Sequence, residues 1–163
     1  MNRLLSILMP LVLMGCATRG FPPVHGIGNF DIVDDKVIRC GQFNAYGLDW
    51  LSKKYPKLTV INLRDDPWSE ESFECAKRGV RYFNLPWNGL CPPSAASLES
   101  ALQLVDAADG WVVVHCKFGC DRTGFLVACR RIRQGEANAA ALDDAIKHGM
   151  VIPLMKERIK RFK

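Results

Sequence analysis

The sequence predicts an α/β fold with a mainly parallel sheet of four to five strands flanked by helices. Short apolar runs alternate with amphipathic stretches along residues 29–163, which is the order of βαβ units with right-handed crossovers. The run Leu58–Leu63 is almost continuously apolar, as expected of a parallel strand that is buried on both faces. A second apolar run, Trp111–His115, ends in a short loop that opens a helix.

The elements are expected in a regular order along the chain. Strands are predicted at 30–33, 36–40, 58–63, 80–85 and 111–115, and helices at 46–54, 66–78, 97–108, 123–134, 137–147 and 153–162.

Local signals set several of these boundaries. Pro56 ends the first helix, because the residue before a proline avoids helical backbone. Asp66 is expected to cap the second helix, with Pro67 in its first turn and Gly79 at its end. The strand 80–85 is expected to be a core strand, followed by a long irregular loop over residues 86–94.

The composition limits the classes of partner. The chain has 163 residues, 24% charged and 48% hydrophobic, which suits one globular domain. The formal net charge of +5 permits an anionic substrate, but no basic tract interleaved with aromatic residues predicts nucleic-acid binding. The basic run over residues 156–163 is interpreted as the solvated face of the last helix.

The N-terminus is typical of a secretory signal that precedes the fold. Arg3 is followed by an apolar stretch from Leu4 to Met14 and then by Gly15 and Cys16. This ending resembles a bacterial lipobox, which implies a signal peptide over residues 1–15 and a lipid on Cys16. An ordinary signal peptide and a short uncleaved anchor remain open. Ala17 after the cysteine implies, for a Gram-negative lipoprotein, the outer membrane facing the periplasm.

The rest of the chain then divides into two parts. Residues 16–28 hold the lipidated cysteine and a Gly- and Pro-rich flexible tether, and residues 29–163 form the domain. Some of the remaining cysteines could pair in an oxidising compartment, and the sequence leaves their connectivity open. They are Cys40, Cys75, Cys91, Cys116, Cys120 and Cys129.

The loop His115-Cys-Lys-Phe-Gly-Cys-Asp-Arg-Thr123 joins the last predicted strand to a helix. A loop that leads into a helix N-terminus presents backbone N–H groups to an anion, and Gly119 lets the chain curl around it. Arg122 supplies a planar fork for two phosphate oxygens. The same field stabilises a thiolate at Cys116, which is placed to attack phosphorus.

These residues resemble the His-Cys-x5-Arg-Ser/Thr signature of the cysteine-dependent phosphatases. The segments KVIRCGQFN and LTVINLRDD resemble the opening of small bacterial and fungal dual-specificity-type tyrosine phosphatases. The resemblance implies that Cys116 is the nucleophile, that Arg122 and Thr123 assist it, and that the loop binds phosphate. The phosphate-binding residues would be Lys117, Phe118, Gly119, Cys120, Asp121 and Arg122. His115 is expected to brace the loop.

The family usually places a general-acid Asp on the loop after the third core strand, but residues 86–94 contain no carboxylate. Asp121 is the first candidate for this acid, because Cys-x2-Gly-x-Asp-Arg-Thr is similar to the loop of some phosphoinositide phosphatases. A bracing role for Asp121 is the alternative. Asp65 and Asp66 are further candidates, although Asp66 is also the predicted helix cap.

The resemblance implies a hydrolase of phosphomonoesters, of the phosphotyrosine or dual-specificity type, that needs no metal or other cofactor. Its partners would be a phosphorylated protein or a phosphorylated small molecule, and a membrane through the lipid. A phosphoinositide or inositol-polyphosphate phosphatase is a second interpretation. A weakly catalytic phosphate binder and a thiol-redox protein using Cys116 and Cys120 are also left open.

Overall fold

The sheet of the computed structural model, which describes residues 20–163, has five strands in the order β1-β2-β5-β3-β4. β2, β5, β3 and β4 run parallel, and β1 pairs antiparallel with β2, which confirms the predicted mainly parallel sheet. The strands are β1 (Asp31–Ile32), β2 (Val37–Cys40), β3 (Thr59–Arg64), β4 (Arg81–Trp87) and β5 (Val112–His115).

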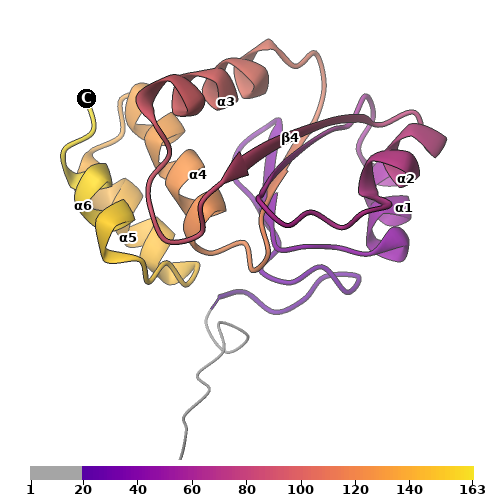
Figure 1. Cartoon of the computed structure of the whole chain (residues 1–163), viewed down its shortest axis with the longest axis horizontal. Helices are drawn as coiled ribbons and strands as arrows, with labels where there is room; N and C mark the ends of the chain where they lie inside the picture. The colour runs from indigo at the N-terminus through magenta and orange to yellow at the C-terminus, as the bar shows by residue number, and fades with distance from the viewer. Residues whose placement is uncertain (1–19) are drawn as a thin grey trace, which may run out of the picture.

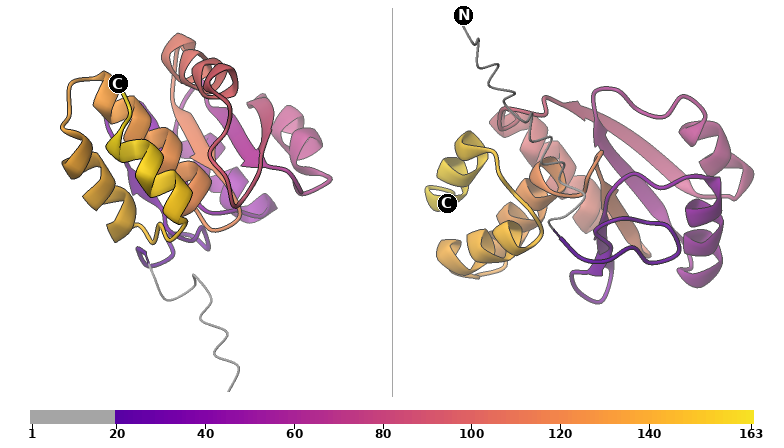
Figure 2. Two further views of the ribbon diagram at one scale, coloured as in Figure 1. Left: turned by 60° about the vertical axis from the view of Figure 1, so that its left-hand side comes forward. Right: turned by 90° about the horizontal axis from the view of Figure 1, so that it is seen from below.

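Helices cover both faces of the sheet, as Figures 1 and 2 show. One face carries α1 and α2, whose Leu48, Leu51 and Cys75 pack with Val113 of β5. The other face carries the remaining four helices, which pack against Val112 and Val114. The helices are α1 (Ala45–Lys54), α2 (Glu71–Lys77), α3 (Ala95–Ala107), α4 (Asp121–Arg133), α5 (Asn138–Lys147) and α6 (Pro153–Lys160).

β5 is the central strand, and its position determines where the loop after it lies. It pairs with β2 on one side and β3 on the other, with His115 opposite Cys40 and Asn62. All four residues of β5 are buried, because alternate side chains face the two helical layers. The carboxyl ends of the parallel strands are where ligands bind in such sheets, so the loop 116–120 lies at the expected edge.

Two predicted elements differ from the structure. The second helix begins at Glu71 and not at Asp66, whose carboxylate accepts a hydrogen bond from Arg64 Nε at 3.0 Å and caps no helix. The Asp66 carboxylate is therefore paired with Arg64 and does not act as the predicted helix cap. The strand predicted at 80–85 is the edge strand β4, mostly exposed, and it continues through Pro86 to Trp87. An edge position tolerates Pro86, which has no N–H to donate to a neighbour.

The segment before β1 packs on the domain. Ile27 is fully buried among residues of the α1 layer, and Gly41 N donates to Gly28 O at 2.8 Å. The boundary predicted at residue 29 thus falls inside a segment that already contacts the fold. Within residues 20–163, no helix is long and apolar enough to span a bilayer. The predicted signal peptide and Cys16 lie outside the described residues.

Candidate active site

The loop between β5 and α4 begins at Cys116 and turns at Gly119. Cys116 is 3% exposed and stands directly after the end of β5. Gly119 adopts a φ of +72°, and a Cβ there would lie 2.5 Å from the carbonyl carbon of Cys40. Two features therefore require glycine at position 119, as predicted: the left-handed backbone and the close approach of β2.

Arg122 lies in the first turn of α4 and completes the predicted phosphate-binding loop, which begins at Cys116. Its guanidinium Nη1 donates to Trp87 O at 3.0 Å and to Asp65 Oδ1 at 2.6 Å. The residue is 8% exposed, and Gly89 of the loop after β4 lies over its guanidinium. Two strand ends, those of β3 and β4, thus fix the direction of the fork.

A hollow of about 280 Å³ opens above this loop. Cys116, Lys117, Phe118, Asp121 and Arg122 line it, so the structure brings together five of the residues predicted to act on phosphate. Gly119 and Cys120 are buried and do not line the hollow. The remaining walls come from the loops after β4 and after α5: Gly89, Leu90, Val151 and Ile152.

The His115 side chain lies on the α1 and α2 face of the sheet, beside Phe43 and Glu71, as the alternation along the strand predicted. Its Nε2 lies 3.0 Å from Oε1 of Glu71, and both side chains are fully buried. Gln42 Nε2 donates to the same Oε1 at 3.0 Å, and Gln42 N donates to Lys117 O at 3.1 Å. Burial raises the pKa of the Glu71 carboxyl, but its bonds to His115, Gln42 and Asn62 outweigh burial and lower it. Glu71 is therefore a buried anion tied to the loop.

A buried cation supports the loop from below. Arg39 of β2 is 1% exposed, and its Nη2 donates to Gly119 O at 3.0 Å. Asp144 of α5 accepts from Nη1 of the same guanidinium at 3.4 Å. Burial lowers the pKa of Arg39 to about 10, with Asp144 opposing the shift, so the group is charged at neutral pH. Its charge adds to the positive electrostatic field around the loop 116–120.

The three candidate acids lie in different places. Asp121 lines the hollow, and its Oδ1 accepts from Val151 N at 2.7 Å and Ile152 N at 2.9 Å. Asp65 pairs with Arg122 at the edge of the site and is half exposed. Asp66 is paired with Arg64.

The buried cysteines differ in their surroundings. Burial raises the pKa of Cys75 and of Cys129 to about 12, which keeps both thiols protonated. Burial also raises the pKa of Cys40, and Cys116 and Glu71 add to the shift. Cys120 is the last residue of the loop, and its Sγ lies 3.6 Å from Asn29 Nδ2. Burial and the raised pKa values indicate that Cys40, Cys75 and Cys129 are packing positions in the fold.

Sequence reasoning missed Glu71, Arg39 and Asn29. Asn29, with a φ of +51°, donates from Nδ2 to His148 O at 2.8 Å and to Phe118 O at 3.4 Å. One signal pointed to Arg39, since a charged residue inside a short apolar strand must find a buried partner. Glu71 carried no such signal, because it sits in an acidic, apparently exposed stretch beside Glu70.

Comparisons with known proteins identify the family of the chain. The family model described as "DSP-PTPase phosphatase fused to NAD+ Kinase" matches residues 22–158. Inositol diphosphatase DSP5 of Arabidopsis thaliana is 28% identical over 122 residues, covering 71% of this chain and 59% of that protein. A probable tyrosine-protein phosphatase, DG1060 of Dictyostelium discoideum, is 30% identical over 111 residues, covering 63% and 65%. The chain thus spans less than two thirds of each relative.

Solved structures show the same fold. The catalytic core of the PP-IP phosphatase SIW14 from S. cerevisiae superposes with a TM-score of 0.74 at 20% identity, covering 88% of each chain. TpbA of P. aeruginosa superposes with a TM-score of 0.70 at 25% identity, again covering 88% of each chain. With the family model matching most of the chain, the protein belongs to the dual-specificity-type family of the cysteine-dependent phosphatases.

Proposed function

We propose that the protein hydrolyses phosphomonoesters through a cysteinyl-phosphate intermediate. The observation that carries the proposal is the hollow in which the sulfur-bearing Cys116 and the guanidinium of Arg122 meet at the N-terminus of α4. A helix N-terminus and a planar cation beside a thiol are the groups that bind a phosphate and place it for attack by sulfur.

Two displacements make up the proposed reaction. The Cys116 thiolate attacks phosphorus, an S–P bond forms and the P–O ester bond breaks, and an acid gives its proton to the departing oxygen. Water then attacks phosphorus and gives its proton to the same carboxylate, and the S–P bond breaks to release phosphate and the thiolate. Arg122 holds two equatorial oxygens throughout.

Thr123 suits the second displacement. Its side chain is fully buried, and its Oγ1 has no hydrogen-bond partner within residues 20–163. A buried hydroxyl without a partner is costly, so a role in a reaction step accounts for its position. We assign it the donation of a hydrogen bond to the Cys116 sulfur as that sulfur leaves.

Asp121 is the proposed acid, and Asp65 is the proposed positioning residue for Arg122. Asp121 lines the hollow, and two backbone N–H groups hold it by Oδ1. These contacts fix one oxygen of the carboxyl at the wall of the hollow, and we assign the proton transfer to the other oxygen. Asp65 does not line the hollow, and its 2.6 Å bond orients the guanidinium.

The charge around the hollow favours a substrate with a single phosphate next to an apolar group, such as phosphotyrosine. Lys117 and Arg122 are the only basic residues that line it within the described part of the chain, whereas Leu90, Phe118, Val151 and Ile152 are apolar. An inositol polyphosphate, the second candidate, is supported by the names of relatives such as the inositol diphosphatases. Several phosphates would need more cations than the walls of this hollow supply.

The location of the protein is a separate proposal. We propose that residues 1–15 are a lipoprotein signal peptide, that Cys16 carries the lipid, and that the domain faces the periplasm from the outer membrane. The support is the sequence from Arg3 to Cys16, which resembles a lipobox. Cys16→Ser should release the protein from the membrane or block its processing, and a substituted protein that stays membrane-bound at its mature size would contradict the anchor.

A substrate panel tests the proposed activity. The full chain is assayed with and without reductant against phosphotyrosine peptides, inositol phosphates and a dithiol-exchange substrate. We expect phosphate release that depends on Cys116 and falls in Arg122→Ala, with phosphotyrosine hydrolysed faster than inositol polyphosphates. Dithiol exchange that survives Arg122→Ala would instead establish the redox interpretation.

A further inference from the structure

Large apolar side chains gather in solvent around the mouth of the hollow. Leu90 is 69% exposed, Phe118 49% and Val151 36%, and all three line it. Leu154, two residues after Ile152, is 57% exposed. We call Leu90, Phe118, Val151 and Leu154 the apolar rim. Clustered exposed apolar residues of this size mark a surface that binds another apolar phase or protein.

The start of the described chain returns to this rim. Phe21 is 44% exposed, and its ring lies 4.6 Å from that of His148, three residues before Val151. Asn29 Oδ1 accepts from Phe21 N at 3.2 Å, while its Nδ2 reaches the carbonyl of Phe118 in the rim. In Figure 1 the start of the coloured chain and the loop leading into α4 lie on the same lower side of the molecule.

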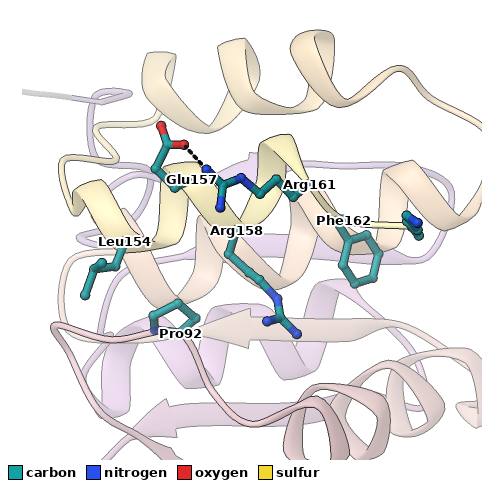
Figure 3. A pocket seen from close by; sticks show the side chains of 7 residues that line it. Pro92, Leu154, Glu157, Arg158, Arg161 and Phe162 are labelled. Atoms are coloured by element: carbon teal, nitrogen blue, oxygen red, sulfur yellow. Dashed lines mark ion pairs between the residues drawn. The ribbon is translucent and has the colours of Figure 1, made fainter.

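A basic groove adjoins the rim at Leu154. It has a volume of about 530 Å³ and runs along α6, where Figure 3 shows Leu154 and Pro92 at one end and Arg158 beyond them. Arg158, Arg161 and Lys163 contribute three positive charges, and Glu157 contributes the one carboxylate side chain among the lining residues. An apolar rim beside a basic groove is the composition of protein surfaces that lie on anionic membranes.

We propose that the apolar rim, with Phe21 and the basic groove, rests on the surface of an anionic lipid bilayer, so that the hollow opens toward the membrane. The proposal deepens the proposed function, on which it rests for the chemistry of the hollow. It favours, among the possible substrates, phosphate esters displayed at a bilayer surface.

The length of chain beyond the described residues supports this orientation. Gly20 is the fourth residue after Cys16, and four extended residues reach at most about 14 Å. A lipid on Cys16 would therefore keep Phe21, and with it the rim, close to the bilayer. The groove charges would then face anionic headgroups, which attract basic residues within about a Debye length.

The test measures which face of the full lipidated chain touches lipid. A tryptophan is introduced at the rim in Leu154→Trp, or on α2 in Phe73→Trp, where the native side chain is equally apolar and 63% exposed. Each protein is bound to vesicles of phosphatidylglycerol and phosphatidylcholine whose phosphatidylcholine carries brominated acyl chains. We expect the added fluorescence at position 154 to be quenched several-fold more than that at position 73.

Charge reversal tests the groove in the same assay. In the Leu154→Trp background, Arg158→Glu with Arg161→Glu is expected to abolish most of the quenching. Lys53→Glu with Lys54→Glu on α1 carries the same charge change and is expected to leave it unchanged. Both pairs are read at low and high salt, because only the groove pair should alter the salt dependence.

Three outcomes would contradict the proposed membrane-binding surface. These are equal quenching at positions 154 and 73, no quenching at position 154, and quenching at position 154 that does not change when Arg158 and Arg161 are replaced by Glu. If hydrolysis of an acidic phosphopeptide needs Arg158 and Arg161 while position 154 stays unquenched, the surface binds a peptide and not a bilayer. Nitrophenyl phosphate hydrolysis is measured on the same samples: quenching without hydrolysis would refute the proposed function alone, and hydrolysis without quenching would refute the surface alone.

Discussion

The floor and the mouth of the hollow are built in opposite ways. At the floor, Cys116 is 3% exposed and Thr123 fully buried, and buried charges from Arg39 and Glu71 hold the loop on both faces of the sheet. At the mouth, the side chains of Leu90 and Phe118 are 69% and 49% exposed, and only the backbone of each accepts or donates a hydrogen bond among residues 20–163. Rigid, buried contacts suit a site where charge must be stabilised without reorganisation.

The difference separates chemistry from substrate choice. Changes at the floor should alter turnover of every phosphate ester, because the cradle binds the phosphate that all substrates share. Changes at the mouth should discriminate between substrates, because only the group beyond the phosphate reaches it. Variants at the floor and at its edge therefore test this division.

Gly119→Ala is expected to cause the largest loss at the floor. The new Cβ would meet the backbone of Cys40 and Gly41 at 2.5–2.6 Å, so the loop must move, and a shift of this size costs on the order of a hundredfold in kcat/KM. Gly79→Ala is the matched control, since it has a φ of +65° but open space around the added Cβ. Equal losses in the two variants would show that backbone strain, and not the clash, is responsible.

Arg122→Lys should lose on the order of tenfold or more in kcat/KM, because a point charge cannot replace two aligned hydrogen bonds. The loss should be similar for aryl and alkyl phosphates. Arg133→Lys at the far end of α4, where Arg133 pairs with Glu99, serves as control. Near-normal kinetics in Arg122→Lys would contradict the proposal that the guanidinium binds phosphate through two aligned hydrogen bonds.

Asp121→Asn should slow alkyl phosphates by about tenfold more than activated aryl phosphates, because an acid is needed where the departing oxygen is strongly basic. Asp65→Asn should affect both ester types equally, since it acts through Arg122. The comparison is made from kcat/KM across a series of leaving groups. Equal loss in Asp121→Asn would assign it the bracing role, and a leaving-group dependence in Asp65→Asn would transfer the acid to Asp65.

Glu71→Gln should produce the smallest effect on chemistry but a measurable loss of stability. The folded state lowers the pKa of Glu71 from its ordinary 4.5, so its stabilisation is present above that pH and is lost as the pH falls through the folded value. We expect about 1–3 kcal/mol less stability at neutral pH, and a difference that shrinks below pH 4.5.

Urea denaturation at several pH values measures this difference. Glu70→Gln, which changes the exposed neighbour that bonds to Trp68, should have no such pH dependence. Stability curves of the wild type and Glu71→Gln that run parallel through acid pH would contradict a buried anion at this position.

The sequence predicted most of the fold because the periodicity of each element is local. The strand before Cys116 and the helix after it were placed by their own apolar residues, and the loop between them by the spacing of Cys116 and Arg122. The second helix was misplaced because Asp66 and Pro67 form a strong local start signal. Tertiary contacts override that signal, since Glu71 must point inward to His115.

The supporting contacts could not be predicted in this way. Arg39 meets Gly119, and Asn29 meets Phe118 and His148, across separations of 80 to 119 residues. Such pairs follow from the order of strands in the sheet and not from any local pattern. The apolar rim likewise combines the loops after β4, β5 and α5 with the first turn of α6.

The central claim is that Cys116 becomes covalently phosphorylated at the floor of the hollow. Rapid acid quench of the full chain with nitrophenyl phosphate, followed by mass spectrometry, measures it directly. We expect a burst of nitrophenol matching the enzyme concentration and a phosphate on the peptide that contains Cys116, with neither in Cys116→Ser. Turnover that persists in Cys116→Ser, or a burst without a phosphorylated Cys116 peptide, would contradict the mechanism.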